Sequence, residues 1–210
     1  MRFAPAGHSR ILGLAIASLL LNILGFPKIG FLLFLVVLFV AYFFRDPERY
    51  APEEENCLVA PADGKVVTVE KHFHDTRFLS APVTRIGIFM SPLDVHVNRA
   101  PIDGQVTKVQ YHPGQFRPAF AADATEVNEQ NAVTIQDDKG RRVVMVQVAG
   151  ILARRIVCAL KGGERVHRGD RYGMIMLGSR VDVYCSPEIE IRVQVGQRVK
   201  AGETVIGEYL

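Results

Sequence analysis

The sequence predicts a mainly β, barrel-sandwich-like domain preceded by an N-terminal α-helical membrane hairpin. Two stretches near the start, residues 11–25 and 29–44, are apolar and contain no charged residue. After residue 55 the chain changes to short β-type runs separated by Asp-Gly, Lys-Gly and Gly-Gly turns. We therefore expect two domains, a membrane hairpin over residues 1–49 and a β-rich domain over residues 50–210.

The two apolar stretches are joined by a short turn. Pro27 interrupts the helical pattern there, and Lys28 is the charged residue of the turn. At about 1.5 Å per residue, stretches of 15 and 16 residues reach roughly 23 Å, which is less than the ~30 Å of a hydrocarbon core. The hairpin is therefore expected either to thin the bilayer locally or to re-enter on one side.

A cleaved signal peptide is the alternative interpretation of this N-terminus. Such a peptide has one apolar region of about 7–15 residues followed by small residues. Here a second apolar run follows and ends in bulky aromatic residues, which favours a retained anchor. Basic residues flank the hairpin on both sides, so both of its ends and the following domain are expected on the cytoplasmic side of the cell membrane. These residues are Arg2, Arg10, Arg45 and Arg49.

Charge is unevenly distributed along the chain. The 210 residues carry a formal net charge of +3. Residues 1–50, with five basic and two acidic residues, account for all of it, and residues 51–210 are neutral. This excludes a generally basic nucleic-acid binder. The three cysteines, Cys57, Cys158 and Cys185, have no metal-binding spacing, so we expect no metal site and a reduced domain.

Two internal repeats favour a barrel-sandwich fold. Residues 60–66 (APADGKV) resemble residues 100–106 (APIDGQV), and residues 163–170 (GERVHRGD) resemble residues 196–203 (GQRVKAGE). Such strand-turn-strand units are similar to those of biotinyl and lipoyl carrier domains. The lysine that those carriers modify is absent, so the similarity concerns architecture only. Strands are expected at residues 65–69, 85–89, 132–135, 143–148 and 189–193.

Three residues are candidates for nucleophilic or acid–base chemistry. Ser179 follows a glycine, and a Gly-Ser pair in a tight turn exposes the hydroxyl and leaves the preceding carbonyl unobstructed. His96 alternates with Asp94 and Asn98, so the three would share one face of a regular strand, where a histidine can act as base or acid. Asp63 precedes a glycine. Each has a structural alternative: an ordinary turn for Ser179 and Asp63, and a satisfied core histidine for His96.

Five segments occur in a specific order along the chain. They are the apolar hairpin, the sequence FRDPER that follows it, the APADG turn, the segment MSPLDVHVNRAP at residues 90–101, and the Leu-Gly-Ser motif at residues 177–179. In this order they closely resemble the short form of the phosphatidylserine decarboxylase family. The resemblance covers essentially the whole chain, and the histidine segment is its most specific part.

The resemblance implies a proenzyme that cuts itself. In this family the serine hydroxyl attacks the carbonyl of the preceding glycine, here Ser179 and Gly178, and converts the peptide bond into an ester. Elimination then breaks the ester, and hydrolysis leaves a pyruvoyl group at the new N-terminus. The products would be a β chain of residues 1–178 and an α chain of residues 179–210.

The resemblance also implies roles for other residues. His96 would take the hydroxyl proton, and Asp63 would orient the imidazole. Larger members of the family have a second histidine where this chain has Arg99, and arginine cannot act as a general base. Arg99 is instead a candidate contact for the substrate phosphate or carboxylate, with a structural salt bridge as the alternative. Arg180 replaces the usual small hydroxyl residue after Ser179 and would put a cation near the scissile bond.

The implied activity is decarboxylation of phosphatidylserine to phosphatidylethanolamine in phospholipid biosynthesis. The substrate amine would form a Schiff base with the pyruvoyl group derived from Ser179, which acts as an electron sink without a metal or external cofactor. The α and β chains would stay together as a heterodimer, and a higher oligomer stays open. Two other classes stay open as well: a membrane-anchored serine hydrolase that uses Asp63, His96 and Ser179 without cleavage, and a non-enzymatic membrane-tethered adaptor.

Overall fold

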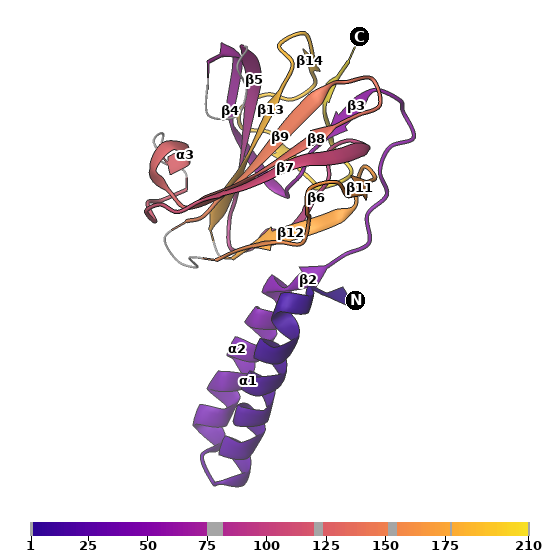
Figure 1. Ribbon diagram of the computed structural model, residues 1–210. Helices are drawn as coiled ribbons and strands as arrows, with labels where there is room; N and C mark the ends of the chain where they lie inside the picture. Colours follow the sequence, from indigo (N-terminus) through magenta and orange to yellow (C-terminus); the bar gives the residue numbers. More distant parts are fainter. Residues whose placement is uncertain (1, 75–81, 120–123, 151–154, 177, 210) are drawn as a thin grey trace. The chain divides into compact units, whose positions relative to one another are not determined.

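The chain forms two compact units, Met1–Glu48 and Arg49–Leu210. Figure 1 shows a helical hairpin in the first unit and a curled assembly of strands in the second. The structure is a computed structural model that describes residues 2–74, 82–119, 124–150, 155–176 and 178–209.

The first unit is a pair of helices joined by a tight turn. Helix α1 spans Pro5–Ile23 and helix α2 spans Pro27–Phe43. Each begins with a proline, whose missing N–H costs nothing in the first turn of a helix. The short strands β1 (Arg2–Phe3) and β2 (Arg45–Asp46) pair antiparallel at the base of the hairpin.

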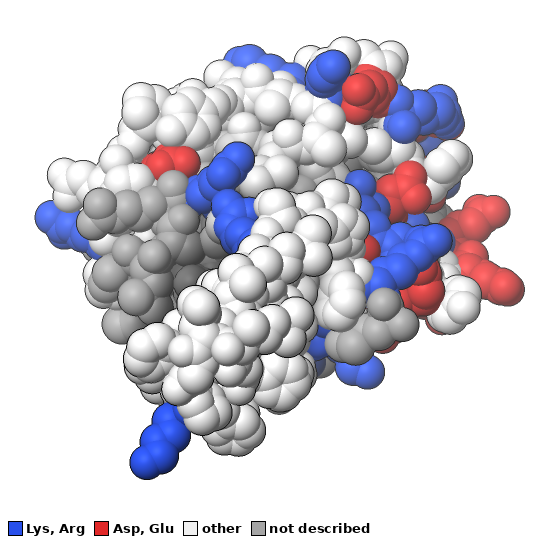
Figure 2. Space-filling view, turned by 90° about the horizontal axis from the view of Figure 1, so that it is seen from below, with Lys and Arg blue, Asp and Glu red and all other residues white. Residues whose placement is uncertain are grey.

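The two helices pack closely through small residues and expose apolar side chains elsewhere. A Cβ on Gly30 would lie 2.2 Å from Asn22 Nδ2, and the Ser18 hydroxyl donates to the Gly30 carbonyl over 2.8 Å. The hairpin surface in Figure 2 is almost entirely uncharged, as expected for a helix that is apolar all round. Its exposed apolar side chains include Leu12, Leu19, Ile23, Phe31 and Leu32.

Both helices begin before the apolar stretches that the sequence marks. Helix α1 continues back through Arg10, whose guanidinium donates to the Ala6 carbonyl. The 19 residues of α1 span about 28 Å and the 17 residues of α2 about 26 Å. By length and composition α1 is able to cross a membrane, and α2 is a shorter apolar helix. The difference between the helix lengths and the ~30 Å hydrocarbon core is therefore smaller than the sequence suggests.

The second unit is built from antiparallel strands. Its largest sheet has eight strands in the order β11-β7-β8-β9-β13-β5-β4-β15 and curls into a half-barrel (Figure 1). Two three-stranded sheets, β10-β12-β6 and β14-β16-β3, complete the unit, and a short helix, α3 (Ala124–Val127), precedes β8. The prediction of a mainly β, barrel-sandwich-like fold is confirmed.

The strands of this unit have the following bounds: β3 Cys57–Val59, β4 Gly64–Phe73, β5 Val83–Met90, β6 Val97–Arg99, β7 Gly104–His112, β8 Gln130–Gln136, β9 Arg142–Val148, β10 Ile156–Cys158, β11 Arg165–Val166, β12 Arg171–Ile175, β13 Ser179–Cys185, β14 Glu190–Ile191, β15 Arg198–Val199 and β16 Val205–Glu208. The strands predicted around residues 65–69, 85–89, 132–135 and 143–148 lie within β4, β5, β8 and β9. The strand predicted at residues 189–193 is shorter, because Ile189 closes a turn by donating to the Ser186 carbonyl.

The two sequence repeats occupy equivalent places at opposite ends of the large sheet. Strand β11 pairs with the start of β7, and β15 pairs with the start of β4. Gly64 and Gly104 approach the adjacent strand so closely that a Cβ would lie 2.1 Å and 2.4 Å from its carbonyl oxygens. The glycine of each Asp-Gly turn is therefore required by close packing, which explains why the sequence repeats there.

Candidate active site

The candidate nucleophile Ser179 is the first residue of β13, a central strand of the large sheet. Its register partner on β5 is Met90, and the next residue, Arg180, pairs with Val148 on β9. Ser179 is fully buried, and its Oγ has no hydrogen-bond partner among the described residues. The expectation that the Gly-Ser pair exposes the hydroxyl in a turn is therefore wrong. The serine lies inside the protein because β13 is hydrogen-bonded on both sides from its first residues.

Gly178 has a backbone conformation that disfavours other residues. Its φ is +67°, in the left-handed region. Its carbonyl oxygen lies against Gly150, where a Cβ would come within 1.7 Å of that oxygen. Leu177, the first residue of the Leu-Gly-Ser motif, lies outside the described residues.

His96 lies just before β6 and is fully buried. Its Nδ1 is 2.9 Å from the backbone carbonyl oxygen of Asp94. A carbonyl oxygen only accepts hydrogen bonds, so this contact assigns the proton of the neutral ring to Nδ1 and leaves Nε2 as the basic nitrogen. This is the tautomer that a general base requires.

Asp94 and His96 do not share a regular strand face, because β6 begins only at Val97. The Asp94 carboxylate instead closes a turn by accepting hydrogen bonds from the backbone N–H and the hydroxyl of Ser91, at 2.8 and 2.7 Å. It also accepts from Arg198 at 3.1 Å. Asp94 is thus a turn residue whose backbone carbonyl orients the histidine.

Asp63 accepts hydrogen bonds from a side chain and from the backbone. Its Oδ2 accepts from Arg49 at 2.9 Å, and its Oδ1 accepts from the backbone N–H of Ala201 at 2.7 Å. Arg49 also pairs with Glu203 at 3.1 Å. These bonds fix Asp63 against the turn before β16, and an action of Asp63 on His96 stays a prediction.

Arg99 is buried at the end of β6, where its guanidinium donates to the Gly169 carbonyl over 2.8 Å. Its aliphatic part lies against Gly202, where a Cβ would come 2.9 Å from Arg99 Cδ. Gly202 follows Ala201, so Arg99 and Asp63 both contact the same turn. A contact between Arg99 and substrate stays a prediction.

A buried amide network connects β6 with the large sheet, and local sequence reasoning missed it. Gln147 on β9 donates to Asn98 Oδ1 over 2.9 Å and accepts from Asn131 on β8 over 3.1 Å. Asn98 in turn contacts the sulfur of Met90, the register partner of Ser179, at 3.8 Å. The available signal was the occurrence of amide side chains at buried positions within apolar strands. Burial raises the pKa of the Cys158 thiol, whose hydrogen bond with Asn131 places it beside this network.

Charged residues lie on the face of β13 opposite to Ser179. Asp182 is fully buried and pairs with Arg180 and with Arg85 of β5, the latter over 3.1 Å. It also accepts from the Thr125 hydroxyl of α3 at 2.7 Å. Burial, the largest single influence, lowers the pKa of Arg85, but the charges of Asp182, Tyr184 and Glu70 and the hydrogen bond to Asp182 together outweigh it, and the net direction is upward. The Arg180 side chain therefore lies on the face of β13 opposite Ser179, where Asp182 pairs with its charge. That Arg180 places a cation near the scissile bond stays a prediction.

Comparisons with known proteins show to which family the chain belongs. The described part of the chain contains no group of three or more His, Cys, Asp or Glu residues that could hold a metal ion. The family profile described as phosphatidylserine decarboxylase matches residues 36–207. The chain belongs to the phosphatidylserine decarboxylase family. Family membership confirms the predicted enzyme class, a decarboxylase.

Three relatives show how far the similarity to this decarboxylase family extends. The phosphatidylserine decarboxylase proenzyme of Syntrophus aciditrophicus is 46% identical over 172 residues, which are 82% of this chain and 80% of that protein. The proenzyme of Pelodictyon phaeoclathratiforme is 47% identical over 83% of this chain and 81% of its own length. That of Saccharopolyspora erythraea is 44% identical over 97% of this chain and 87% of its own length. All three are named proenzymes, which describes precursors that are processed.

Proposed function

We propose that this chain is a membrane-attached proenzyme that cuts itself between Gly178 and Ser179 and then decarboxylates phosphatidylserine to phosphatidylethanolamine. The observation that carries the proposal is the buried Ser179 hydroxyl at the start of a central strand, directly after a glycine with φ of +67°. An unsatisfied polar atom inside a protein is costly, and a chemical role is one reason why a native structure retains such an atom. Conversion of Ser179 into a pyruvoyl group removes this hydroxyl.

His96 supplies a basic nitrogen for the first step. Because its Nδ1 proton is held by the Asp94 carbonyl, Nε2 can take the proton of the serine hydroxyl during attack on Gly178. The buried surroundings exclude water, which would compete with the serine for the carbonyl. Asp63 and Arg99 are expected to support the histidine and the substrate from the turn at Ala201.

The fold explains how the two chains stay together after cleavage. Residues 179–210 contribute β13, β14, β15 and β16. Strand β13 pairs with β5 and β9, β15 pairs with β4, and β16 pairs with β3. Cleavage before Ser179 breaks one peptide bond and leaves these pairings in place. An α/β heterodimer is therefore the expected product.

A pyruvoyl group formed from Ser179 would supply an electron-withdrawing carbonyl for the decarboxylation. The buried face around it limits access of water, and His96 is in the correct tautomer to receive or return a proton. The apolar hairpin fits a lipid substrate, because attachment to the cell membrane keeps the enzyme where phosphatidylserine lies. Basic residues on both sides of the hairpin favour a cytoplasmic location for the catalytic unit.

Intact-mass measurement of the detergent-solubilised protein tests the proposal. Wild type should give chains of 178 and 32 residues, the smaller with a pyruvoyl N-terminus. Ser179→Ala should stay uncut and release no CO₂ from phosphatidylserine vesicles. Ser186→Ala, which changes a serine just beyond β13, should be cut and active.

A wild-type chain that releases CO₂ from phosphatidylserine while uncut would refute the proposal. An uncut chain that hydrolyses an ester substrate would favour a serine hydrolase. An uncut chain without decarboxylase or hydrolase activity would favour an adaptor. His96→Ala should be cut at least about 100-fold more slowly, as expected for loss of a general base. Cleavage of this variant at the wild-type rate would remove His96 from that role.

A further inference from the structure

The carbonyl oxygen of Gly178 lies against Gly150 of the chain. A Cβ built on Gly150 would be 1.7 Å from this oxygen and 2.9 Å from its carbonyl carbon. Both obstacles are backbone atoms, so a side chain could not be accommodated by a rotamer change. Gly178 itself has free space where a Cβ would be, so the close contact concerns its carbonyl group. This is the carbonyl that Ser179 attacks in the proposed cleavage.

The position of Gly150 follows from the pairing of β9 with β13. Val148, the last residue of β9, pairs with Arg180. Residues 149 and 150, which follow β9, therefore run alongside Ser179 and Gly178. The backbone N–H of Ala149 donates to the Glu129 carbonyl over 2.9 Å, which continues the contact with the segment before β8. Ala149 is fully buried. The backbone at 149–150 is therefore held in place from two sides.

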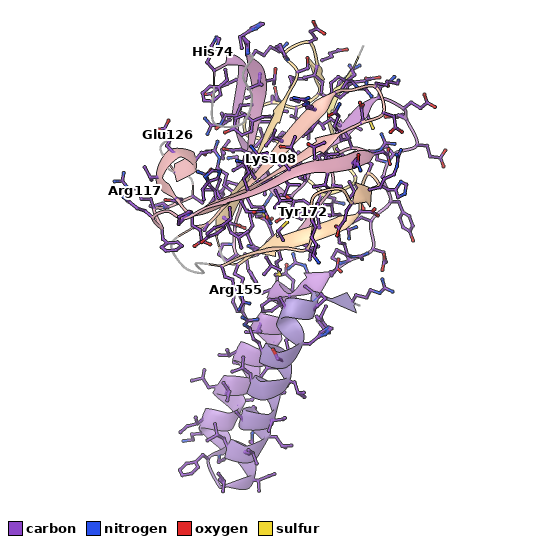
Figure 3. All side chains as sticks on the ribbon, viewed as in Figure 1. His74, Lys108, Arg117, Glu126, Arg155 and Tyr172 are labelled. Carbon is purple, nitrogen blue, oxygen red and sulfur yellow. The ribbon has the colours of Figure 1, made fainter. Side chains whose placement is uncertain are left out.

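Asn128 fixes this backbone further. Its Nδ2 donates to the carbonyls of Ala149 and Arg117, each over 2.8 Å, and its Oδ1 accepts from the backbone N–H of Arg117 over 2.8 Å. Asn128 is buried and follows α3, and Figure 3 shows Arg117 beside that helix. One amide side chain thus ties the loop at Arg117 to the backbone on which the Gly178 carbonyl rests.

We propose that Gly150 is a positioning residue for self-cleavage: its lack of a side chain allows the Gly178 carbonyl to take the orientation in which Ser179 can attack, and Asn128 holds Gly150 in place. The inference rests on the proposed function. In the step concerned, a C–O bond forms between Ser179 Oγ and the Gly178 carbonyl carbon, and the C–N bond between Gly178 and Ser179 breaks. The hydroxyl proton passes to the released amine nitrogen by way of the general base. No oxidant or reductant is needed.

The expected size of the effect follows from the geometry. A methyl group on Gly150 would have to move the Gly178 carbonyl by more than 1 Å to relieve a separation of 1.7 Å. A misplacement of about 1 Å between reacting groups can slow a reaction by roughly 100-fold. Replacing the Asn128 amide by a carboxylate removes both donors and loosens the 149–150 backbone, so we expect roughly a 10-fold slower reaction.

The experiment measures cleavage of the full-length protein in detergent for Gly150→Ala and for the control Gly162→Ala, where a Cβ meets open space. Gly150→Ala should still fold, with a melting temperature below that of uncut Ser179→Ala because the added methyl displaces buried backbone, while cleavage slows by about 100-fold or more. Hydroxylamine, which cleaves esters, should release no fragment from Gly150→Ala, because attack on the carbonyl is blocked before the ester forms. Gly162→Ala should be cut like wild type.

Other outcomes decide against the inference. Cleavage of Gly150→Ala at the wild-type rate would overturn it, and so would hydroxylamine release of the 32-residue fragment, because the ester would then have formed. If Gly150→Ala does not fold, Asn128→Asp decides, with Asn56→Asp as the control, because the Asn56 side chain bonds to Lys139 and Arg141 and not to the 149–150 backbone. Slower cleavage of folded Asn128→Asp than of Asn56→Asp supports the inference, and equal rates overturn it. If wild type itself is uncut, the proposed function fails instead.

Discussion

The two faces of β13 are both buried, but they differ in chemistry. The face that carries Ser179 continues with Val181 and Val183, which belong to the main apolar core. The opposite face carries Arg180 and Asp182, which take part in a network of ion pairs and hydrogen bonds. Alternation of side chains along a strand brings these two environments within one residue of each other.

This difference separates reactivity from anchoring. The apolar face keeps water and competing charges away from the serine, whereas the ionic face fixes the strand through side chains of β4, β5 and α3. Gly87 of β5 makes room for this, because a Cβ there would lie 2.3 Å from the Arg180 guanidinium. In the proposed cleavage the first residue of β13 would lose its covalent link to the preceding chain, and such anchoring would then hold the strand in place.

The largest expected loss of stability comes from removing the carboxylate of Asp182, the central charge of the ionic face. Asp182→Ala leaves Arg85 and Arg180 buried without their shared carboxylate, and we expect a loss of about 3–5 kcal/mol in the free energy of unfolding. Denaturant unfolding in detergent measures this loss. Asp138→Ala, which removes the exposed partner of Arg165, should cost less than about 1 kcal/mol. Equal losses in the two variants would contradict the distinction between a buried network and a surface pair.

A substitution on the apolar face tests how much packing contributes to the stability of β13. Val183→Ala removes two buried methyl groups, and we expect a loss of about 2 kcal/mol in the free energy of unfolding, with cleavage retained. Val195→Ala at an exposed position is the matched control and should change stability little. A larger loss for Val183→Ala than for Asp182→Ala would show that packing, and not the ion network, is the main anchor of β13.

The fold was largely predictable because its signals are local. Alternating β-branched residues and Asp-Gly turns mark β4, β5, β8 and β9, and the repeated turn sequences correspond to equivalent ends of the large sheet. The helix boundaries were less well predicted. Absence of charge marks where a helix becomes apolar, while helix α1 begins earlier, at Pro5, and includes Arg10.

The surroundings of the candidate site were less predictable, because they depend on pairing between distant segments. A Gly-Ser dipeptide does not reveal that Ser179 starts a strand that lies between β5 and β9. Gly150 is 28 positions before Gly178 in the sequence, and the two meet only through the register of β9 with β13. The buried contacts of Asn128 and Gln147 also require tertiary structure.

The smallest predicted effect concerns pH and the last residue of the apolar face. Burial raises the pKa of Cys185 to about 12, from an ordinary value of 9.0. A raised pKa stabilises the fold fully below pH 9 and less as pH rises, because the unfolded chain loses the thiol proton first. From pH 8 to pH 10 wild type should therefore lose about 1 kcal/mol more stability than Cys185→Ala. Tyr209, whose pKa is raised by burial and by the neighbouring Cys185, contributes to the pH dependence of both proteins. Parallel curves of unfolding free energy against pH would show that Cys185 is accessible to water and that the apolar face is less dry than its side chains indicate.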